Sequence, residues 1–145
     1  MVFDTAAGEL SPAVFKTEVQ PYLTHLAQKF PGKLGYYSKG TTSAHVGELR
    51  QMTSFAGFGL DHRFELSEEL KRQGTGFLQG NFDQALLFCS PEEFESRLDQ
   101  YLKPLSLLTP EQRRFWVCGL GHGVLPGTPE VNVARFVQKI REVFR

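Results

Sequence analysis

The sequence predicts an α/β fold made of parallel β/α units, a partial TIM-like (β/α)8 barrel comprising about its last five units. Short apolar segments alternate with longer amphipathic ones along the 145 residues, as strands alternate with helices in a parallel sheet. Polar residues follow each apolar segment, as they do at the active-site rim of such barrels. No linker, low-complexity tract or charge block divides the chain, so residues 1–145 are predicted to form one domain.

Short apolar segments predict five strands, at residues 1–4, 34–38, 56–61, 76–79 and 115–120. A closed barrel of this type needs about 250 residues. The sequence also begins inside its first predicted strand, with no preceding helix. Either an open five-stranded sheet stands alone or three β/α units are missing, and we expect missing units.

The first helices are predicted from apolar spacing and proline positions. Pro12 begins the first helix at a position where its missing N–H costs little, and Pro21 should kink or split that helix. A short helix is expected at residues 44–52. Another is expected at residues 67–72, with Ser67 as its N-cap.

The later helices have clearer start signals. Ser90 and Glu93 form a predicted capping box, in which each side chain satisfies a free backbone N–H. Thr128 and Pro129 are expected to open the last helix in the same manner. A short extra helix is expected at residues 109–114.

Composition and charge exclude several classes of protein. Sixteen basic residues balance sixteen acidic ones, so no overall charge favours nucleic acid or an acidic membrane surface. No apolar run is long enough for a membrane span, and no signal peptide is apparent. Cys89 and Cys118 lie far apart without a C-x-x-C motif, which indicates reduced, buried thiols in a cytoplasmic protein.

Polar residues at the strand ends predict a functional rim. The carboxyl ends of parallel strands share one face, and barrel active sites are built there. Helix capping alone could explain individual residues, Asp83 above all, but it is a weaker explanation for five consecutive strand ends. The polar residues in question are Asp4, Thr5, Ser38, Lys39, Asp61, His62, Gln79, Asn81, Asp83 and His122.

Four segments resemble the uroporphyrinogen decarboxylase family in order and approximate spacing. Residues 3–10, FDTAAGEL, are similar to the family's F-D-S/T-x-x-G-x-L, and residues 59–61, GLD, to its G-L/V-D. Residues 79–83, QGNFD, are similar to Q-G-N-L/M-D, and residues 121–126, GHGVLP, to G-H-G-I/L-x-P. Each motif is weak alone, but four in register are specific, and the likeness covers nearly the whole chain.

The sequence departs from the family pattern at three positions and lacks one region. His62 stands where the family usually has Trp, Gln84 where it has Pro, and Gly119 where it has Asn. These changes affect the fit to substrate more than family membership. The family's N-terminal portion is not in this chain, and that portion carries its catalytic Asp, its Arg residues and its substrate-binding Tyr.

The resemblance implies a reaction and partners. Such enzymes decarboxylate the four acetate side chains of uroporphyrinogen to give coproporphyrinogen in heme biosynthesis, without any cofactor or metal. They are commonly homodimers. The resemblance therefore implies a tetrapyrrole substrate, a homodimer and no nucleic-acid or membrane partner.

The resemblance also assigns roles to three residues. Thr5 matches a Ser or Thr that hydrogen-bonds a substrate carboxylate, although its hydroxyl could instead bond its own turn. His122 matches the active-site His, expected to contact a substrate side chain and assist proton movement, and Phe3 matches an apolar residue lining the cleft. Gly121 and Gly123 are expected either to need unusual dihedrals or to allow the substrate to approach the backbone closely. Lys39 is either a partner for anionic side chains or a solvated rim residue.

Other interpretations of the sequence have weaker support. His25 and His45 lie in predicted helices and are expected to be ordinary surface residues. Corrinoid-dependent methyltransferases share the barrel but hold zinc through an H-x-C pair, whereas Leu87 and Trp116 stand two residues before the cysteines here. The chain could also be a non-catalytic half-barrel that acts as an assembly module. The G-x-G-x-x-G nucleotide motif fails because Val124 occupies the third glycine position.

Overall fold

The computed structural model describes residues 1–144, in which five parallel strands form one sheet in the order β1-β2-β3-β4-β5. The strands are β1 (Val2–Asp4), β2 (Leu34–Ser38), β3 (Phe55–Gly59), β4 (Phe77–Phe82) and β5 (Trp116–Leu120). The helices are η1 (Ala7–Glu9), α1 (Pro12–Glu18), α2 (Gln20–Lys29), α3 (Ser43–Arg50), α4 (Leu66–Arg72), η2 (Gln84–Phe88), α5 (Pro91–Ser106), α6 (Pro110–Arg113) and α7 (Glu130–Val143). The sheet is open and has two edge strands, β1 and β5, as expected for part of a barrel.

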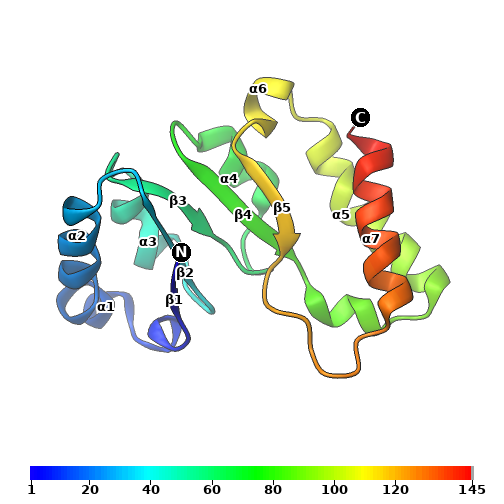
Figure 1. The fold of residues 1–145 in the computed structure, drawn as a ribbon, viewed down its shortest axis with the longest axis horizontal. Helices are drawn as coiled ribbons and strands as arrows, with labels where there is room; N and C mark the ends of the chain where they lie inside the picture. The colour runs from blue at the N-terminus through cyan, green and yellow to red at the C-terminus, as the bar shows by residue number, and fades with distance from the viewer. Residues whose placement is uncertain (145) are drawn as a thin grey trace.

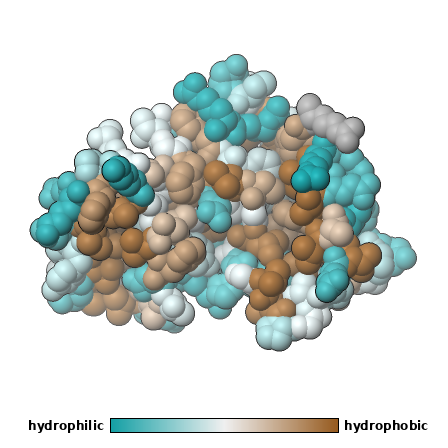
Figure 2. All heavy atoms as spheres, viewed as in Figure 1, coloured by the Kyte–Doolittle hydropathy of each residue, from teal (hydrophilic) through white to brown (hydrophobic). Residues whose placement is uncertain are grey.

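In the described residues, helices cover one face of the sheet and leave the other open (Figure 1). In Figure 1, α3 and α4 lie behind the strands, α1 and α2 lie beyond the β1 side, and α5 and α7 lie beyond the β5 side. Strand alternation sends Tyr36, Phe58 and Leu78 to the covered face, where each is at most 3% exposed. The same alternation leaves Phe3 74% exposed and Val117 45% exposed. Figure 2 shows hydrophobic residues at several places on this face, with hydrophilic residues between them.

Aromatic side chains lie over glycines on the open face. A Cβ added at Gly57 would lie 2.4 Å from the Phe77 ring, and one at Gly35 would lie 3.0 Å from it. A Cβ added at Gly59 would lie 2.8 Å from the Tyr37 ring. These glycines therefore give the two rings room to lie flat across neighbouring strands.

Several helix predictions are confirmed and others are wrong. The chain splits into α1 and α2 next to Pro21, and Ser90 Oγ accepts the Glu93 N–H at the start of α5. The Glu93 carboxylate, however, pairs with Arg97 rather than completing the capping box. Ser67 lies inside α4, because that helix begins at Leu66.

The start of the last helix also differs from the prediction. Thr128 Oγ1 donates to the Leu125 carbonyl, 2.6 Å away, so it closes the preceding turn and does not cap α7. Strand β4 extends to Phe82, which places Gln79 and Asn81 inside the strand rather than after it. Within residues 1–144, no helix combines the length and the apolarity that crossing a membrane requires.

Candidate functional site

Asp4 shapes the loop that follows β1. Its Oδ1 accepts hydrogen bonds from the N–H groups of Ala6 and Ala7, 3.2 and 3.1 Å away. This carboxylate takes the capping role that the Thr5 hydroxyl could have filled. Within the described part of the chain the Thr5 hydroxyl makes no hydrogen bond, and Thr5 is exposed.

The Thr5 loop rests on the loop after β2. A Cβ added at Gly8 would lie 2.1 Å from the Lys39 carbonyl oxygen, so only glycine allows the two backbones to approach this closely. His45 supports the far end of the loop: its Nε2 lies 2.9 Å from the Leu10 carbonyl and its Nδ1 accepts the Thr42 N–H. The prediction that His45 is a surface residue is wrong, because it is 6% exposed and joins two loops.

Asp61 and Asn81 connect rim loops. Asp61 is 2% exposed, and its carboxylate accepts the Gly40 N–H at 2.7 Å and the Arg63 guanidinium at 2.6 Å. The Asn81 amide donates to the carbonyls of Asp61 and Phe64, at 2.8 and 2.7 Å. The Asp61 carboxylate is therefore occupied by a backbone N–H and a neighbouring cation, and the Asn81 amide by two backbone carbonyls. Both side chains hold the rim loops together.

Gly121 fixes the start of the loop after β5. Its N–H donates to the Phe82 carbonyl, and its carbonyl accepts the Tyr37 hydroxyl, each at 2.7 Å. A Cβ at Gly121 would lie 2.7 Å from the backbone nitrogen of His62, so glycine is needed here for packing against the protein's own backbone. The expected unusual dihedral is not found, because the φ of Gly121 is not positive. Gly123 differs from expectation: its φ is not positive, and a Cβ there would meet nothing within 4 Å.

The three predicted site residues surround one cavity. It has a volume of about 230 Å³ and is lined by Phe3, Asp4, Thr5, Tyr37, Lys39, His122 and Gly123. A second cavity of about 260 Å³ shares Phe3, Tyr37 and His122 with the first and extends along Gly59, Gln79 and Leu120. His122 is exposed, and its ring has one weak polar contact, Nδ1 to the Gly123 carbonyl at 3.4 Å.

The combination of groups in these cavities suits an anionic, partly aromatic ligand. Thr5 offers a hydroxyl, Lys39 an ammonium and His122 an imidazole, which all can donate to carboxylates. Phe3 and Tyr37 present ring surface, with centroids 6.1 Å apart in an edge arrangement. Tyr37 is not among the residues predicted from the sequence, although strand alternation next to the buried Tyr36 places it on the open face.

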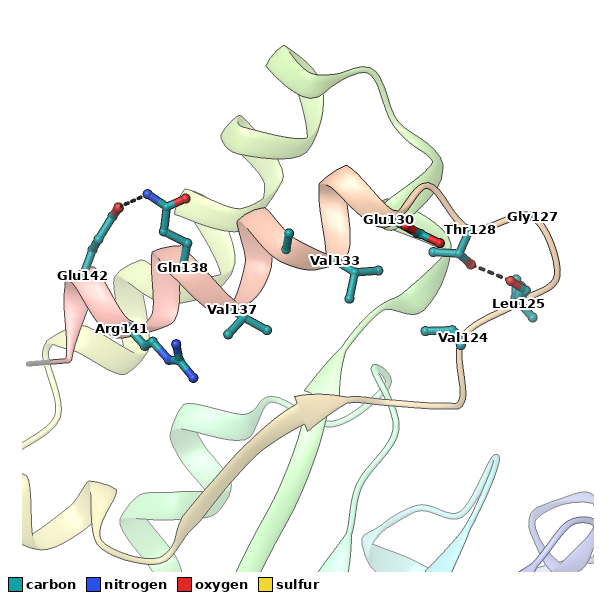
Figure 3. A pocket seen from close by; sticks show the side chains of 11 residues that line it. Val124, Leu125, Gly127, Thr128, Glu130, Val133, Val137, Gln138, Arg141 and Glu142 are labelled. Atoms are coloured by element: carbon teal, nitrogen blue, oxygen red, sulfur yellow. Dashed lines mark hydrogen bonds between the residues drawn. The ribbon is translucent and has the colours of Figure 1, made fainter.

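A larger cavity lies elsewhere, along α7. It has a volume of about 830 Å³ and lies between this helix and the loop after β5. In Figure 3, Val133, Val137 and Arg141 project from one side of α7, and Val124 projects from the loop into the same space. This groove is apolar and open, and it is lined by neither Phe3, Thr5 nor His122. Its size reflects an uncovered helix face rather than convergent polar groups.

The three departures from the family pattern have different surroundings. His62 is exposed, with Nδ1 3.9 Å from Asp83 Oδ1. Gln84 is buried at the start of η2, and its Oε1 has no hydrogen-bond partner among the described residues. Gly119 has open space around it, since an added Cβ would be 4.0 Å from Gln79.

The two cysteines are free and partly buried. Burial raises the pKa of the Cys118 thiol to about 12. Residues 1–144 contain no group of three or more His, Cys, Asp or Glu side chains placed to hold a metal ion.

Parallel β/α units with a polar cavity at the carboxyl ends of their strands define this chain as part of a (β/α)-barrel protein. A model of the family described as Uroporphyrinogen decarboxylase (URO-D) matches residues 1–143. The chain therefore belongs to the uroporphyrinogen decarboxylase family.

Curated relatives agree with this assignment. The chain is 34% identical to a uroporphyrinogen decarboxylase of Synechococcus sp. (strain CC9605), over 98% of this chain and 40% of that protein. It is 30% identical to the one of Xylella fastidiosa (strain Temecula1 / ATCC 700964), over 99% of this chain and 42% of that protein. The chain thus spans about two fifths of the length of these relatives.

Proposed function

We propose that this chain forms the substrate-carboxylate side of a uroporphyrinogen decarboxylase active site. The observation that carries the proposal is the cavity shared by Phe3, Thr5, Lys39 and His122 in a chain of this family. The substrate has acetate and propionate side chains around a ring of pyrroles, so it needs both carboxylate partners and apolar surface. The cavity offers both.

The proposed chemistry is loss of carbon dioxide from each acetate. Protonation of a pyrrole ring carbon creates an iminium that accepts the electron pair of the breaking carbon–carbon bond. Carbon dioxide leaves, and the ring then carries an exocyclic methylene. An acid protonates this methylene to form the methyl group, and loss of the proton first added to the ring carbon restores the pyrrole, so one proton is taken up for each carbon dioxide released. His122 and Thr5 would hold the carboxylate side chains, and His122 would assist proton movement, while Phe3 would line the cleft.

The proposal also limits what the chain does alone. The family's catalytic Asp and its Arg residues belong to the N-terminal portion, so we expect negligible turnover by these 145 residues. The proposal includes a cytoplasmic location and a homodimeric assembly. The free cysteines support the first, and the two unpaired sheet edges support a need for further protein contacts.

A chimera tests the proposal. The Synechococcus relative keeps its N-terminal portion, and its last two fifths are replaced by this chain. We expect the chimera to convert uroporphyrinogen without added metal or cofactor, whereas the 145-residue chain should not. His122→Asn in the chimera should lower turnover or redistribute partially decarboxylated intermediates, with the free energy of unfolding changed by less than about 1 kcal/mol.

His25→Asn is the matched control, because His25 is an exposed histidine on α2. Product chromatography and thermal melting are measured on the same samples. Loss of stability with unchanged turnover per folded molecule would show that His122 is structural. Robust turnover by the isolated chain would contradict the expectation that catalysis requires the Asp of the family's N-terminal portion.

A further inference from the structure

Two adjacent tyrosines on β2 point to opposite faces of the sheet. Tyr36 is 1% exposed on the helix-covered face, and its hydroxyl donates to Asp4 at 3.3 Å. Tyr37 lies on the open face and lines both cavities next to His122. The four segments that resemble the family include neither tyrosine, so the resemblance assigns no role to Tyr37.

Tyr37 spans the open face from β2 to the end of β5. Strands β3 and β4 lie between these two strands, yet the Tyr37 hydroxyl donates to the Gly121 carbonyl at 2.7 Å. The ring reaches this far because it crosses β3 at Gly59, where a Cβ would lie only 2.8 Å from Cδ2. Burial, followed by the charge of Asp61, raises the pKa of Tyr37 above its ordinary value, which keeps the phenol protonated and able to donate this hydrogen bond.

The carbonyl that Tyr37 holds belongs to the peptide unit that leads into His122. A peptide unit is planar, so fixing the Gly121 oxygen also fixes the direction of the His122 N–H and Cα. The Gly121 N–H is held from the other side by Phe82. The His122 ring itself is exposed and has one weak polar contact, so its direction depends on this backbone rather than on packing.

We propose that Tyr37 is a positioning residue that orients His122 through the Gly121 carbonyl. This inference rests on the proposed function only for its effect on turnover, because the orientation of the loop can be measured separately. In the substrate complex, the hydroxyl keeps the imidazole directed into the cavity and spares the ligand the entropic cost of ordering the loop. Tyr37 acts through His122 and does not take part in the proton transfer.

Hydrogen exchange in the 145-residue chain tests the orientation. Tyr37→Phe removes the hydroxyl and keeps the ring, and we expect exchange of the Gly121 amide to accelerate several-fold, up to about tenfold. Tyr101→Phe is the matched control, because the Tyr101 hydroxyl donates to the Gly80 carbonyl and accepts the Asn81 N–H on the covered face. That variant should accelerate Asn81 and leave Gly121 unchanged.

Gly59→Ala tests the loss of the Tyr37–Gly121 hydrogen bond in a second way. It keeps the hydroxyl but displaces the ring, and Gly121 exchange should again accelerate. The Leu78 amide, in the centre of the sheet, reports global opening in every variant. Unchanged Gly121 exchange in Tyr37→Phe, or equal acceleration at Gly121 and Leu78, would overturn the positioning role.

A double-mutant cycle in the chimera tests the connection to His122. Tyr37→Phe should lower turnover on its own and have no further effect when His122 is already Asn, because both changes remove one function. Additive losses would show that Tyr37 acts independently of His122 and would overturn the inference. An inactive chimera would contradict the proposed function, whereas the exchange result would still decide whether Tyr37 holds the loop.

Discussion

The two faces of the sheet differ in what surrounds the same kind of residue. On the covered face, apolar side chains such as Leu78 are fully enclosed by helices. On the other, Phe3 and Val117 remain exposed, and Tyr37 and Phe77 lie over glycines rather than under helices. The covered face supplies the stability of the fold, whereas the open face carries the candidate site. Residues on the open face are therefore free to be selected for ligand contacts rather than for packing.

Shortening one apolar side chain on each face should give the largest difference in the free energy of unfolding between the two faces. Leu78 is 0% exposed, so Leu78→Ala should lower the free energy of unfolding by about 2–5 kcal/mol through lost burial and a residual cavity. Val117→Ala removes a side chain that is 45% exposed and should cost about 0.5 kcal/mol or less. Denaturant unfolding measures both. Similar losses at the two positions would contradict the difference between the faces.

Self-association should follow from the open face and the free edges. β1 and β5 each have one unpaired side, and apolar groups are exposed beside them, so we expect the chain to dimerise or aggregate. Val117→Lys places a charge on β5 and should raise the monomer fraction in light scattering over a range of concentrations. Tyr22→Lys changes an exposed aromatic residue on α2 and should not. A compact wild-type monomer at all concentrations would contradict this expectation.

Periodic local patterns made the architecture predictable from sequence. All five strands occur within a few residues of their expected positions, and the helices between them follow from apolar spacing and proline placement. Helix starts were less predictable. Ser67 and Thr128 both have cap-forming side chains, but the helices begin at Leu66 and Glu130, and Thr128 bonds a turn instead.

Contacts between distant residues were not predictable from local patterns. His45 looked like a surface residue in a short helix, because its partner, the Leu10 carbonyl, is 35 residues away. The bond from Tyr37 to Gly121 joins residues 84 positions apart. The motif resemblance indicated Phe3, Thr5 and His122, which line one cavity, whereas Asp61 and Asn81 hold rim loops together. Sequence indicated which residues reach the rim but not which of them are already occupied.

The smallest expected effect concerns the ion pairs between α5 and α7. Glu95 on α5 accepts hydrogen bonds from Arg135 and Lys139 on α7, and these hold its pKa at about 2, below the ordinary 4.5. A depressed folded-state pKa stabilises the fold above about pH 4.5, and this contribution is lost as the pH falls toward about 2. Because the pair is partly exposed, Glu95→Gln should cost no more than about 1 kcal/mol at neutral pH.

The pH dependence distinguishes this ion pair from a loss of packing. Unfolding free energies of wild type and Glu95→Gln should converge as the pH falls from about 4.5 to about 2, because the wild-type carboxylate becomes protonated over that interval. Glu92→Gln is the control, since Glu92 is exposed on the same helix and makes no ion pair within residues 1–144. A difference that stays constant across this interval would mean that Glu95 contributes through its shape rather than its charge. The ion pairs that Glu95 makes with Arg135 and Lys139 would then add nothing measurable to the stability of the fold.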